Sequence, residues 1–486
     1  MIFGGGQRVG RGLLLAAALL GARGARAAAT GRDAGAIYAE LCANCHGKGL
    51  EGAKGPGLRP EQLKHGRDDA ALERAIRGGY PQNGMPAFAN AMSEAETRAL
   101  IDYLHEVSGR AADPQLKQSE PLPAGVLPSE EYPFRLESVV EGLDVPWSIA
   151  FLPDGSFLVT ERVGRLRRVE HGRLDPQPIE GVPPVVVKDE AGLMSVMAHP
   201  DFANNHWIYL TFSDPGDNGT AMTKVVRARL DGHRLTDQLV IFALPREKYP
   251  PGYVLFGSRM VFEDGCLFFS VGVRGLETEV TQQAQDLDRP NGKIHRVQPD
   301  GAIPPDNPFV GRPGAWPSIW AYGVRNPQGL AADPRNGDLW ETEHGPRGGD
   351  ELNLIRRGRN YGWPVITHGM NYDGTPISDK TEAPGMEQPV LHWTPSVAAS
   401  EIEFYRGELF PKWRNNLFMG SLAQQTLYRF VIEGGRVTHQ EEVFKDLGRI
   451  RDIKTAPDGS LYIALELIGR PGRVVRMIPA ENSAVK

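Results

Sequence analysis

The sequence predicts a multidomain protein, with a small all-α domain over residues 30–110 and a larger all-β domain over residues 134–480. Three observations lead to this prediction. Helical patterns occur early in the chain, over residues 34–46 and 94–107. Residues 111–133 are polar and rich in proline without periodicity, which is typical of a linker. Beyond them, short apolar runs alternate with turn residues, and no long helical pattern occurs.

The second predicted helix has a clear start signal. Ser93 and Glu96 form a capping box, in which a serine at the N-cap is followed three residues later by a glutamate. Leu100 and Leu104 then fall on one face of the helix. We therefore expect this helix to pack an apolar face against the rest of a small domain.

One unit recurs along the all-β domain: an alternating strand, a tight turn that often contains Pro, Asp or Gly, and a second, apolar strand. The copies are spaced by roughly 45 to 75 residues, and strand-only repeats of about that length are typical of four-stranded propeller blades. We therefore predict a six-bladed β-propeller. The alternative is a two-sheet sandwich whose turns recur by chance. The six copies begin at Ser148, Ser195, Arg259, Gln328, Glu401 and Arg451.

Charge and hydropathy limit the function classes. The chain has 54 basic and 60 acidic residues, a net charge of −6, and this balance argues against a nucleic-acid partner. No segment reaches the ~18 consecutive apolar residues of a transmembrane helix, so we predict no integral membrane segment.

Residues 1–29 are predicted to be a signal peptide. Arg8 and Arg11 form a basic start, Leu13–Leu20 is a short apolar core, and Ala25–Ala27 is an A-x-A cleavage site. The alternative is a retained N-terminal anchor. The signal predicts a periplasmic or secreted protein.

Cys42, Cys45 and His46 form a C-x-x-C-H motif, the attachment signature of c-type haem. Two thiols three residues apart on one helical turn can both reach the haem vinyl groups, and the following histidine can then ligate the iron. A disulfide or zinc site is the alternative, but no second Cys/His pair follows. The motif predicts a covalently bound haem c.

Met85 is the predicted second ligand of the haem iron. It lies between Gly84 and Pro86 after the haem motif, and Met/His ligation is typical of cytochromes c. Met92 is the rival candidate. With its helices and methionine loop, the domain resembles a class I cytochrome c, which implies one-electron transfer and a redox partner.

Several segments of the all-β domain share their residues with one enzyme family. They are Val145–Phe151, Gly192–Phe202, Gly323–Gly329, Glu343–Glu351 and Asn360–Pro364. Over nearly all of residues 135–478 the chain resembles the soluble aldose and glucose dehydrogenases, which use pyrroloquinoline quinone (PQQ) and calcium. The resemblance implies a six-bladed propeller that oxidises a small sugar or alcohol.

The resemblance also implies cofactor-binding residues. Arg325, Arg449 and Arg451 match the arginines that hold the cofactor carboxylates, and Asn326 follows in the same motif. Arg325 could also stabilise charge that develops on the quinone oxygen, which makes it a candidate catalytic residue. The alternative for each arginine is a salt bridge between blades.

Two calcium sites are implied in the same way. Main-chain oxygens of Gly345 and Pro346 match one site, and Glu351 with the carbonyl of Tyr361 matches the other. Ca²⁺ prefers oxygen ligands, backbone carbonyls included.

Five positions depart from the family pattern. Leu255 replaces the general-base histidine, Ala423 replaces a cofactor-binding lysine, Glu190 replaces a glutamine, and Val254 and Val324 replace an acidic residue and a histidine. Leucine cannot accept a proton, and losing a positioned base typically costs ~10²–10⁴ in rate. Losing the lysine contact costs roughly 1.5–3 kcal/mol. Glu190 is the candidate substitute base.

Three hypotheses follow from the sequence. The first is an exported quinoprotein dehydrogenase that passes electrons to its own haem. The second is an electron-transfer cytochrome whose propeller has lost dehydrogenase catalysis and binds a ligand or partner. The third is a propeller enzyme with another metal or cofactor.

Overall fold

The computed structural model of the 486-residue chain describes residues 34–46, 50, 54–58, 63, 66, 69–111, 119–275, 281–468 and 470–480. The predicted signal peptide lies outside the described residues, as do residues 112–118 of the predicted linker. The chain divides into two compact units, residues 1–112 and 113–486.

The N-terminal unit is helical. The first three helical segments follow one another directly, so the predicted helix over residues 34–46 is confirmed, with a π-helical turn in its middle. Its core joins Ile37, Leu72, Ile76, Leu100 and Leu104 from three different helices. The helical segments are α1 (Ala34–Ile37), η1 (Tyr38–Cys42), α2 (Ala43–His46), α3 (Asp69–Gly78), η3 (Pro81–Asn83) and α4 (Glu94–Ala111).

The predicted capping box begins α4. The backbone N–H of Ser93 donates to the Glu96 carboxylate at 2.9 Å, and the N–H of Glu96 donates to the Ser93 hydroxyl at 3.2 Å. Two backbone donors that the first turn leaves without a partner are thereby satisfied.

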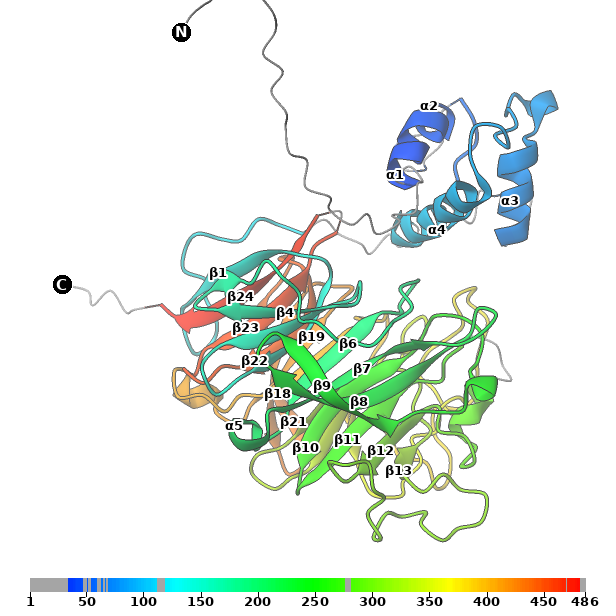
Figure 1. Cartoon of the computed structure of the whole chain (residues 1–486). Coiled ribbons are helices and arrows are strands. Elements are labelled where there is room, and N and C mark those ends of the chain that lie inside the picture. The colour runs from blue at the N-terminus through cyan, green and yellow to red at the C-terminus, as the bar shows by residue number, and fades with distance from the viewer. Residues whose placement is uncertain are drawn as a thin grey trace, which may run out of the picture. The chain divides into compact units, whose positions relative to one another are not determined.

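The described residues of the C-terminal unit form six four-stranded antiparallel sheets (Figure 1). The prediction of a six-bladed propeller is therefore confirmed. From the inner to the outer strand, the first five blades are β2 (Pro146–Phe151), β3 (Phe157–Glu161), β4 (Arg165–Glu170), β5 (Arg173–Leu174); β6 (Leu193–Ala198), β7 (Trp207–Pro215), β8 (Ala221–Asp231), β9 (Arg234–Phe242); β10 (Gly257–Glu263), β11 (Cys266–Val271), β12 (Lys293–Val297), β13 (Ile319–Tyr322); β14 (Pro327–Ala332), β15 (Leu339–Glu343), β16 (Asp350–Ile355), β17 (Leu391–Trp393); and β18 (Ala399–Phe404), β19 (Leu417–Ser421), β20 (Leu427–Glu433), β21 (Arg436–Phe444).

The sixth blade closes the ring with the two ends of the domain. Its strands are β22 (Arg449–Thr455), β23 (Leu461–Glu466), β24 (Gly472–Pro479) and β1 (Phe134–Leu143). β1 pairs antiparallel with β24, from Phe134 opposite Pro479 to Leu143 opposite Gly472. The first strand of the domain thus completes the last blade, and this pairing of the two ends closes the ring.

Each of the six sequence repeats falls on the first strand of a different blade, namely β2, β6, β10, β14, β18 or β22. These strands contact one another around the centre of the ring. Every residue of these strands is buried or half-buried, which is consistent with the short apolar runs of the repeats.

Part of the predicted linker packs on the propeller. Leu122, Leu127 and Tyr132 contact a core cluster of the C-terminal unit, and Leu127 pairs with Phe134 in a short antiparallel bridge. The Glu130 carboxylate lies 3.2 Å from the Arg429 guanidinium. The residues that could link the two units are thereby reduced to those before Ser119.

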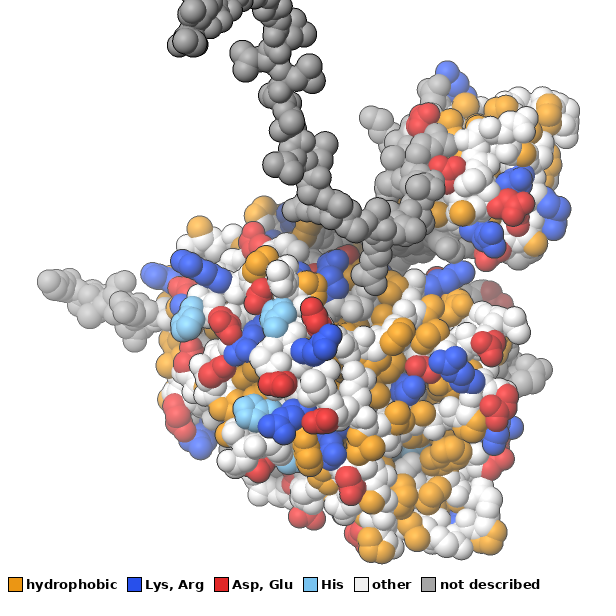
Figure 2. Space-filling view, viewed as in Figure 1, with side chains coloured by type: hydrophobic (Ala, Val, Ile, Leu, Met, Phe, Trp, Pro, Cys, Tyr) orange, Lys and Arg blue, Asp and Glu red, His pale blue; other side chains and the backbone are white. Residues whose placement is uncertain are grey.

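Across the parts of the chain that the structure describes, the helices are too short or too polar to cross a membrane. On the face shown in Figure 2, acidic and basic side chains are interspersed over the propeller.

Candidate functional site

The predicted haem-attachment residues lie together in the N-terminal unit. Cys42 ends the π-helical turn, and Cys45 and His46 follow in α2. Burial, with the neighbouring Cys45, raises the pKa of the Cys42 thiol to about 11. His46 is buried, and its Nδ1 lies 2.7 Å from the carbonyl oxygen of Pro56. With Nδ1 donating to that carbonyl, Nε2 keeps its lone pair for a metal.

Gly55 lies close to this histidine. A Cβ at residue 55 would lie 3.1 Å from Cε1 of His46, so a larger side chain would push against the ring. The two thiols, the oriented imidazole and the close glycine fit a covalently bound haem.

The two candidate methionine ligands lie in different surroundings. Met92 is only 4% exposed and packs within the hydrophobic core of the unit. Met85 is partly exposed and follows Gly84, whose positive φ of +82° ends η3. Paired backbone hydrogen bonds of 2.9 and 3.1 Å between Met85 and Tyr80 hold this loop. Met85 therefore lies partly exposed on a fixed loop, and its role as ligand stays a prediction.

In the propeller, the predicted arginines come together at one mouth of the central channel. Arg325 and Asn326 directly precede β14, and Arg449 and Arg451 lie at the start of β22. All three arginines lie close enough to His344 to affect its titration. Burial, followed by the charges of Arg325, Arg451 and Arg449, lowers the pKa of His344 to about 3. The site thus combines three guanidinium groups with a neutral imidazole.

Glu466 on β23 orients two of these arginines. Its Oε2 accepts hydrogen bonds from Nε of Arg449 at 3.1 Å and from Nε of Arg451 at 2.7 Å. Although burial opposes it, these guanidiniums hold the pKa of Glu466 well below its usual range. Arg451 also lies over the ring of Trp147, with its guanidinium carbon 4.4 Å from the centroid. Two guanidinium groups against one carboxylate leave a net positive charge here, and the nearby Arg162 adds to it.

Arg325 lines a cavity of about 210 Å³ at this mouth. Its Nη1 donates to the carbonyl of His344 at 2.7 Å, and its guanidinium carbon lies 5.3 Å from the centre of the Trp363 ring. Asn326 is buried, and its side-chain oxygen accepts from the N–H of Gly257 at 3.1 Å, so it joins two blades. The other lining residues are Thr281, Gln282, Pro346, Pro364, Asn371, Tyr372, Pro376 and Ile377.

The predicted calcium ligand Glu351 belongs to a buried group of carboxylates. It lies opposite Glu343 in the register of β15 and β16, and Glu341 lies two residues before Glu343. Burial raises the pKa of all three carboxyl groups, and Glu343 adds to this for the other two. Oε1 of Glu341 and Oδ1 of Asn353 are buried without a hydrogen-bond partner among the described residues.

These oxygen donors fit Ca²⁺ in kind. Within the described ranges, no group of three or more His, Cys, Asp or Glu side chains is spaced to hold a metal ion. Main-chain carbonyls would therefore have to complete the site. Of the predicted contributors, Pro346 lines the Arg325 cavity. The N–H of Gly345 donates to the Asp350 carboxylate at 2.9 Å. Tyr361 is buried, and its hydroxyl donates to the carbonyl of Leu354.

The positions that depart from the family pattern either pack among apolar side chains or make hydrogen bonds with the backbone. Leu255 is buried with Val273, Ala284 and Trp363. The Glu190 carboxylate accepts the N–H of Leu255 at 2.7 Å. Ala423 binds through its backbone to the Val397 carbonyl at 3.1 Å, and Val324 is in the core.

Sequence reasoning missed His344, Glu466 and Glu341 as members of these sites. For Glu341 a signal is present, because Glu341 and Glu343 lie two residues apart and therefore on the same face of a strand. Glu466 meets Arg449 and Arg451 through the register of β22 and β23, whereas His344 of the fourth blade meets them only because separate blades pack together.

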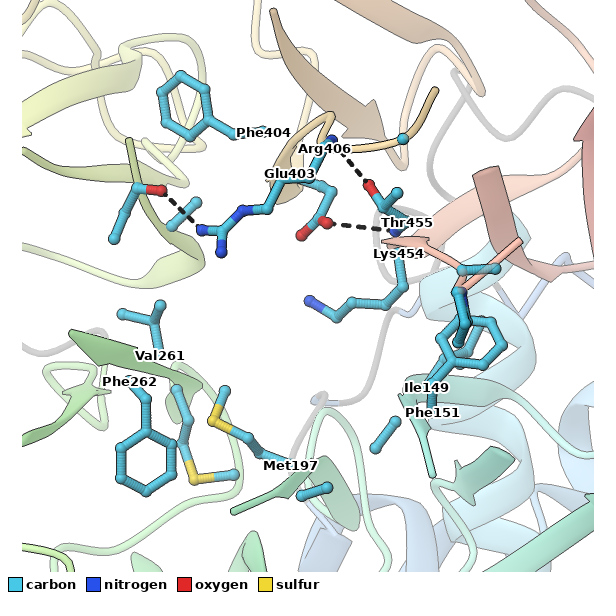
Figure 3. A pocket seen from close by; sticks show the side chains of 18 of the residues that line it. Ile149, Phe151, Met197, Val261, Phe262, Glu403, Phe404, Arg406, Lys454 and Thr455 are labelled. Carbon is cyan, nitrogen blue, oxygen red and sulfur yellow. Dashed lines mark hydrogen bonds between the residues drawn. The ribbon is translucent and has the colours of Figure 1, made fainter. Parts of the chain in front are cut away.

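The inner strands end at a second cavity, of about 720 Å³. It is formed by the ends of β14 and β22, whereas the arginines lie at their starts, so the two cavities occupy opposite mouths of the channel. Phe151, Met197 and Phe262 lie around this cavity and Lys454 points into it (Figure 3). Lys454 is paired with buried Glu401 at 2.7 Å. None of the predicted site residues lines this cavity.

A family model described as Glucose / Sorbosone dehydrogenase matches residues 143–476. The chain belongs to this family. A second model, described as Cytochrome C oxidase, cbb3-type, subunit III, matches residues 29–104. The protein is therefore a cytochrome c domain fused to a glucose/sorbosone dehydrogenase propeller, as the sequence predicts, and the cytochrome c domain implies haem c.

Relatives in the glucose/sorbosone dehydrogenase family cover the propeller. Aldose sugar dehydrogenase YliI of Escherichia coli (strain K12) is 42% identical over 335 residues, which are 68% of this chain and 89% of that protein. The apo-form structure of the soluble aldose sugar dehydrogenase from Escherichia coli has 39% identity and a TM-score of 0.66, covering 71% of this chain and 100% of that chain. The PQQ-bound aldose sugar dehydrogenase of Streptomyces coelicolor has 28% identity and a TM-score of 0.57, covering 71% and 98%.

Proposed function

We propose that the protein is an exported, haem c-containing quinoprotein dehydrogenase. Its propeller would bind PQQ and calcium, oxidise a small sugar or alcohol, and pass the electrons to its own haem. The observation that carries this proposal is the convergence of Arg325, Arg449 and Arg451 at one mouth of the channel, beside a cavity and a group of buried carboxylates. Bound PQQ would supply a two-electron acceptor.

The residues of the propeller would bind and orient. Arg449 and Arg451, held by Glu466, offer positive charge to an anionic cofactor. Arg325 is held by the carbonyl of His344 and faces the cavity. Because Leu255 cannot take a proton, we propose that the substrate or the proton acceptor differs from that of the aldose dehydrogenases.

The fused haem domain completes the electron balance. Oxidation of an alcohol to a carbonyl removes two electrons and two protons, whereas a haem iron takes one electron at a time. Two transfers to the haem would therefore complete each turnover. Cys42 and Cys45 would hold the haem, and His46 and Met85 would ligate its iron.

A second candidate function is an electron-transfer cytochrome whose propeller no longer catalyses oxidation. The apolar packing of Leu255 favours it, because the wall in which the family places its base is hydrophobic here.

Reconstitution of the purified protein separates the two functions. PQQ and Ca²⁺ are added, followed by an aldose or an alcohol, and haem reduction is followed by its absorption spectrum. Reduction that requires PQQ, Ca²⁺ and substrate together supports the dehydrogenase. Bound PQQ without haem reduction by any of these substrates contradicts it and supports the second function.

Replacing Met85 by alanine tests the second haem ligand. We expect the sulfur-to-iron absorption band to disappear and the reduction potential to fall by on the order of 0.1 V or more, because loss of a thioether ligand destabilises the reduced iron. Met92→Leu is the matched control, since Met92 packs in the core, and it should leave band and potential in place. An unchanged band in Met85→Ala would assign the ligand elsewhere.

Calcium is expected to stabilise the propeller. At about 100 times its Kd, a ligand of the folded state adds ~2.7 kcal/mol to the free energy of unfolding. Thermal unfolding followed by near-UV circular dichroism should show a higher Tm with Ca²⁺ in the wild type and little change in Glu351→Gln. Glu180→Gln, at an exposed ion pair, is the control that should respond like the wild type. Equal stabilisation of all three proteins would place calcium away from Glu351.

A further inference from the structure

Leu255 has an unusual backbone conformation. Its φ is +58°, and the φ of Arg274 is +72°. The left-handed region costs an ordinary residue about 1–2 kcal/mol, and such residues persist only where their surroundings hold them. The contacts around Leu255 show what holds it.

The peptide group between Val254 and Leu255 is gripped at both ends. Its N–H, from Leu255, donates to the Glu190 carboxylate at 2.7 Å. Its carbonyl, from Val254, accepts a hydrogen bond from Nη1 of Arg274. The backbone N–H of Arg274 also donates to the carbonyl of Leu255 at 3.2 Å, so both peptide groups around Leu255 are held. The anion at the N–H end and the cation at the carbonyl end both align with the peptide dipole.

The Arg274 side chain is held in place by its surroundings. It is fully buried, and its guanidinium carbon lies 3.3 Å from the centre of the Phe256 ring. Its Nη2 donates to the carbonyls of Ala221 and Gly252, both at 3.1 Å. Burial lowers its pKa to about 9, and the charge of Glu190 opposes this shift. The group is therefore a cation at neutral pH, fixed by carbonyl oxygens.

The gripped segment supports the wall of the Arg325 cavity. Leu255 packs in one cluster with Trp363 and Ile377, and both of these residues line the cavity. A change in the backbone at residue 255 would move the side chain on which Trp363 rests.

We infer that Glu190 and Arg274 are positioning residues that clamp the Val254–Leu255 peptide, hold residue 255 in its left-handed conformation, and so set the wall of the Arg325 cavity. The inference deepens the proposed function, and its ligand-binding consequence rests on that function. The clamp assigns Glu190 a task that depends on its acceptor oxygen rather than on proton transfer.

Hydrogen exchange of the Leu255 amide tests the clamp without any cofactor. Exchange is measured by mass spectrometry on the full-length protein with its haem attached. Over residues 252–258 it should be roughly tenfold faster or more in Glu190→Ala and in Arg274→Met than in the wild type. Glu190→Gln should exchange as slowly as the wild type, because its amide oxygen can still accept the N–H. Arg429→Gln, which removes another buried arginine, is the matched control and should leave this peptide unchanged.

PQQ binding in the presence of Ca²⁺, measured by calorimetry, tests the consequence. We expect a Kd roughly tenfold weaker in Arg274→Met and in Glu190→Ala, and a Kd near that of the wild type in Glu190→Gln, whose amide oxygen can still accept the N–H of Leu255. Unchanged amide exchange in both Glu190→Ala and Arg274→Met would overturn the clamp. An intact wild type that binds no PQQ would instead contradict the proposed function, and the exchange result would still decide the clamp.

Discussion

Replacing both Cys42 and Cys45 by alanine is expected to abolish covalent haem attachment completely. The two thiols are the only groups of the C-x-x-C-H motif that can form thioether bonds, and the motif lies on one continuous helical segment that presents them together. Acid–acetone extraction of the variant should remove any remaining haem, whereas the haem of the wild type should stay with the protein. Electron transfer to an external acceptor should then be lost.

The third cysteine supplies the control for this experiment. Cys266 is buried on β11 of the propeller, and burial raises the pKa of its thiol. Cys266→Ala should retain its haem, because a buried protonated thiol in another domain takes no part in attachment. Haem that resists extraction from the Cys42→Ala, Cys45→Ala variant would contradict the assignment.

Restoring two missing groups is expected to give the largest gain in activity. We expect the wild type, loaded with PQQ and Ca²⁺, to oxidise glucose slowly or not at all, because Leu255 cannot accept a proton. Leu255→His should raise kcat by up to about 10²-fold, at the lower end of what a positioned base contributes. The left-handed backbone at residue 255 suits this change, since histidine is found in that region more often than leucine.

Ala423→Lys should strengthen the binding of an anionic cofactor by one charge-assisted contact, roughly 1.5–3 kcal/mol. The double variant should exceed the combined gains of the single ones, because base and cofactor must be present together for turnover. Steady-state kinetics with glucose and haem reduction as readout would measure this. Glu403→Lys, at the opposite mouth of the channel, is the control for an added lysine. Robust glucose turnover by the wild type would sink the idea and would direct attention to Glu190 as the proton acceptor.

Local sequence signals predicted much of the architecture. The capping box of Ser93 and Glu96 and the haem motif act over three or four residues, so their geometry follows from the helix itself. The six blades were predictable because each inner strand repeats the same apolar run and turn, with the alternation that a strand requires. Family resemblance identified the arginines, and the structure brings Arg325, Arg449 and Arg451 around His344.

By itself, the sequence determined the fold class, the haem domain and the dehydrogenase family of this protein. Tertiary structure alone decided what depends on contacts between distant segments. Arg449 and Arg451 of the sixth blade lie near His344 of the fourth blade. Glu190 accepts the amide N–H of Leu255, and Arg274 donates to the carbonyl at the far end of the same peptide. The physical reason is that the packing of separate loops and blades, together with buried charge, sets these contacts. A buried guanidinium must find carbonyl or carboxylate oxygens, and only the folded ring determines which ones are within reach.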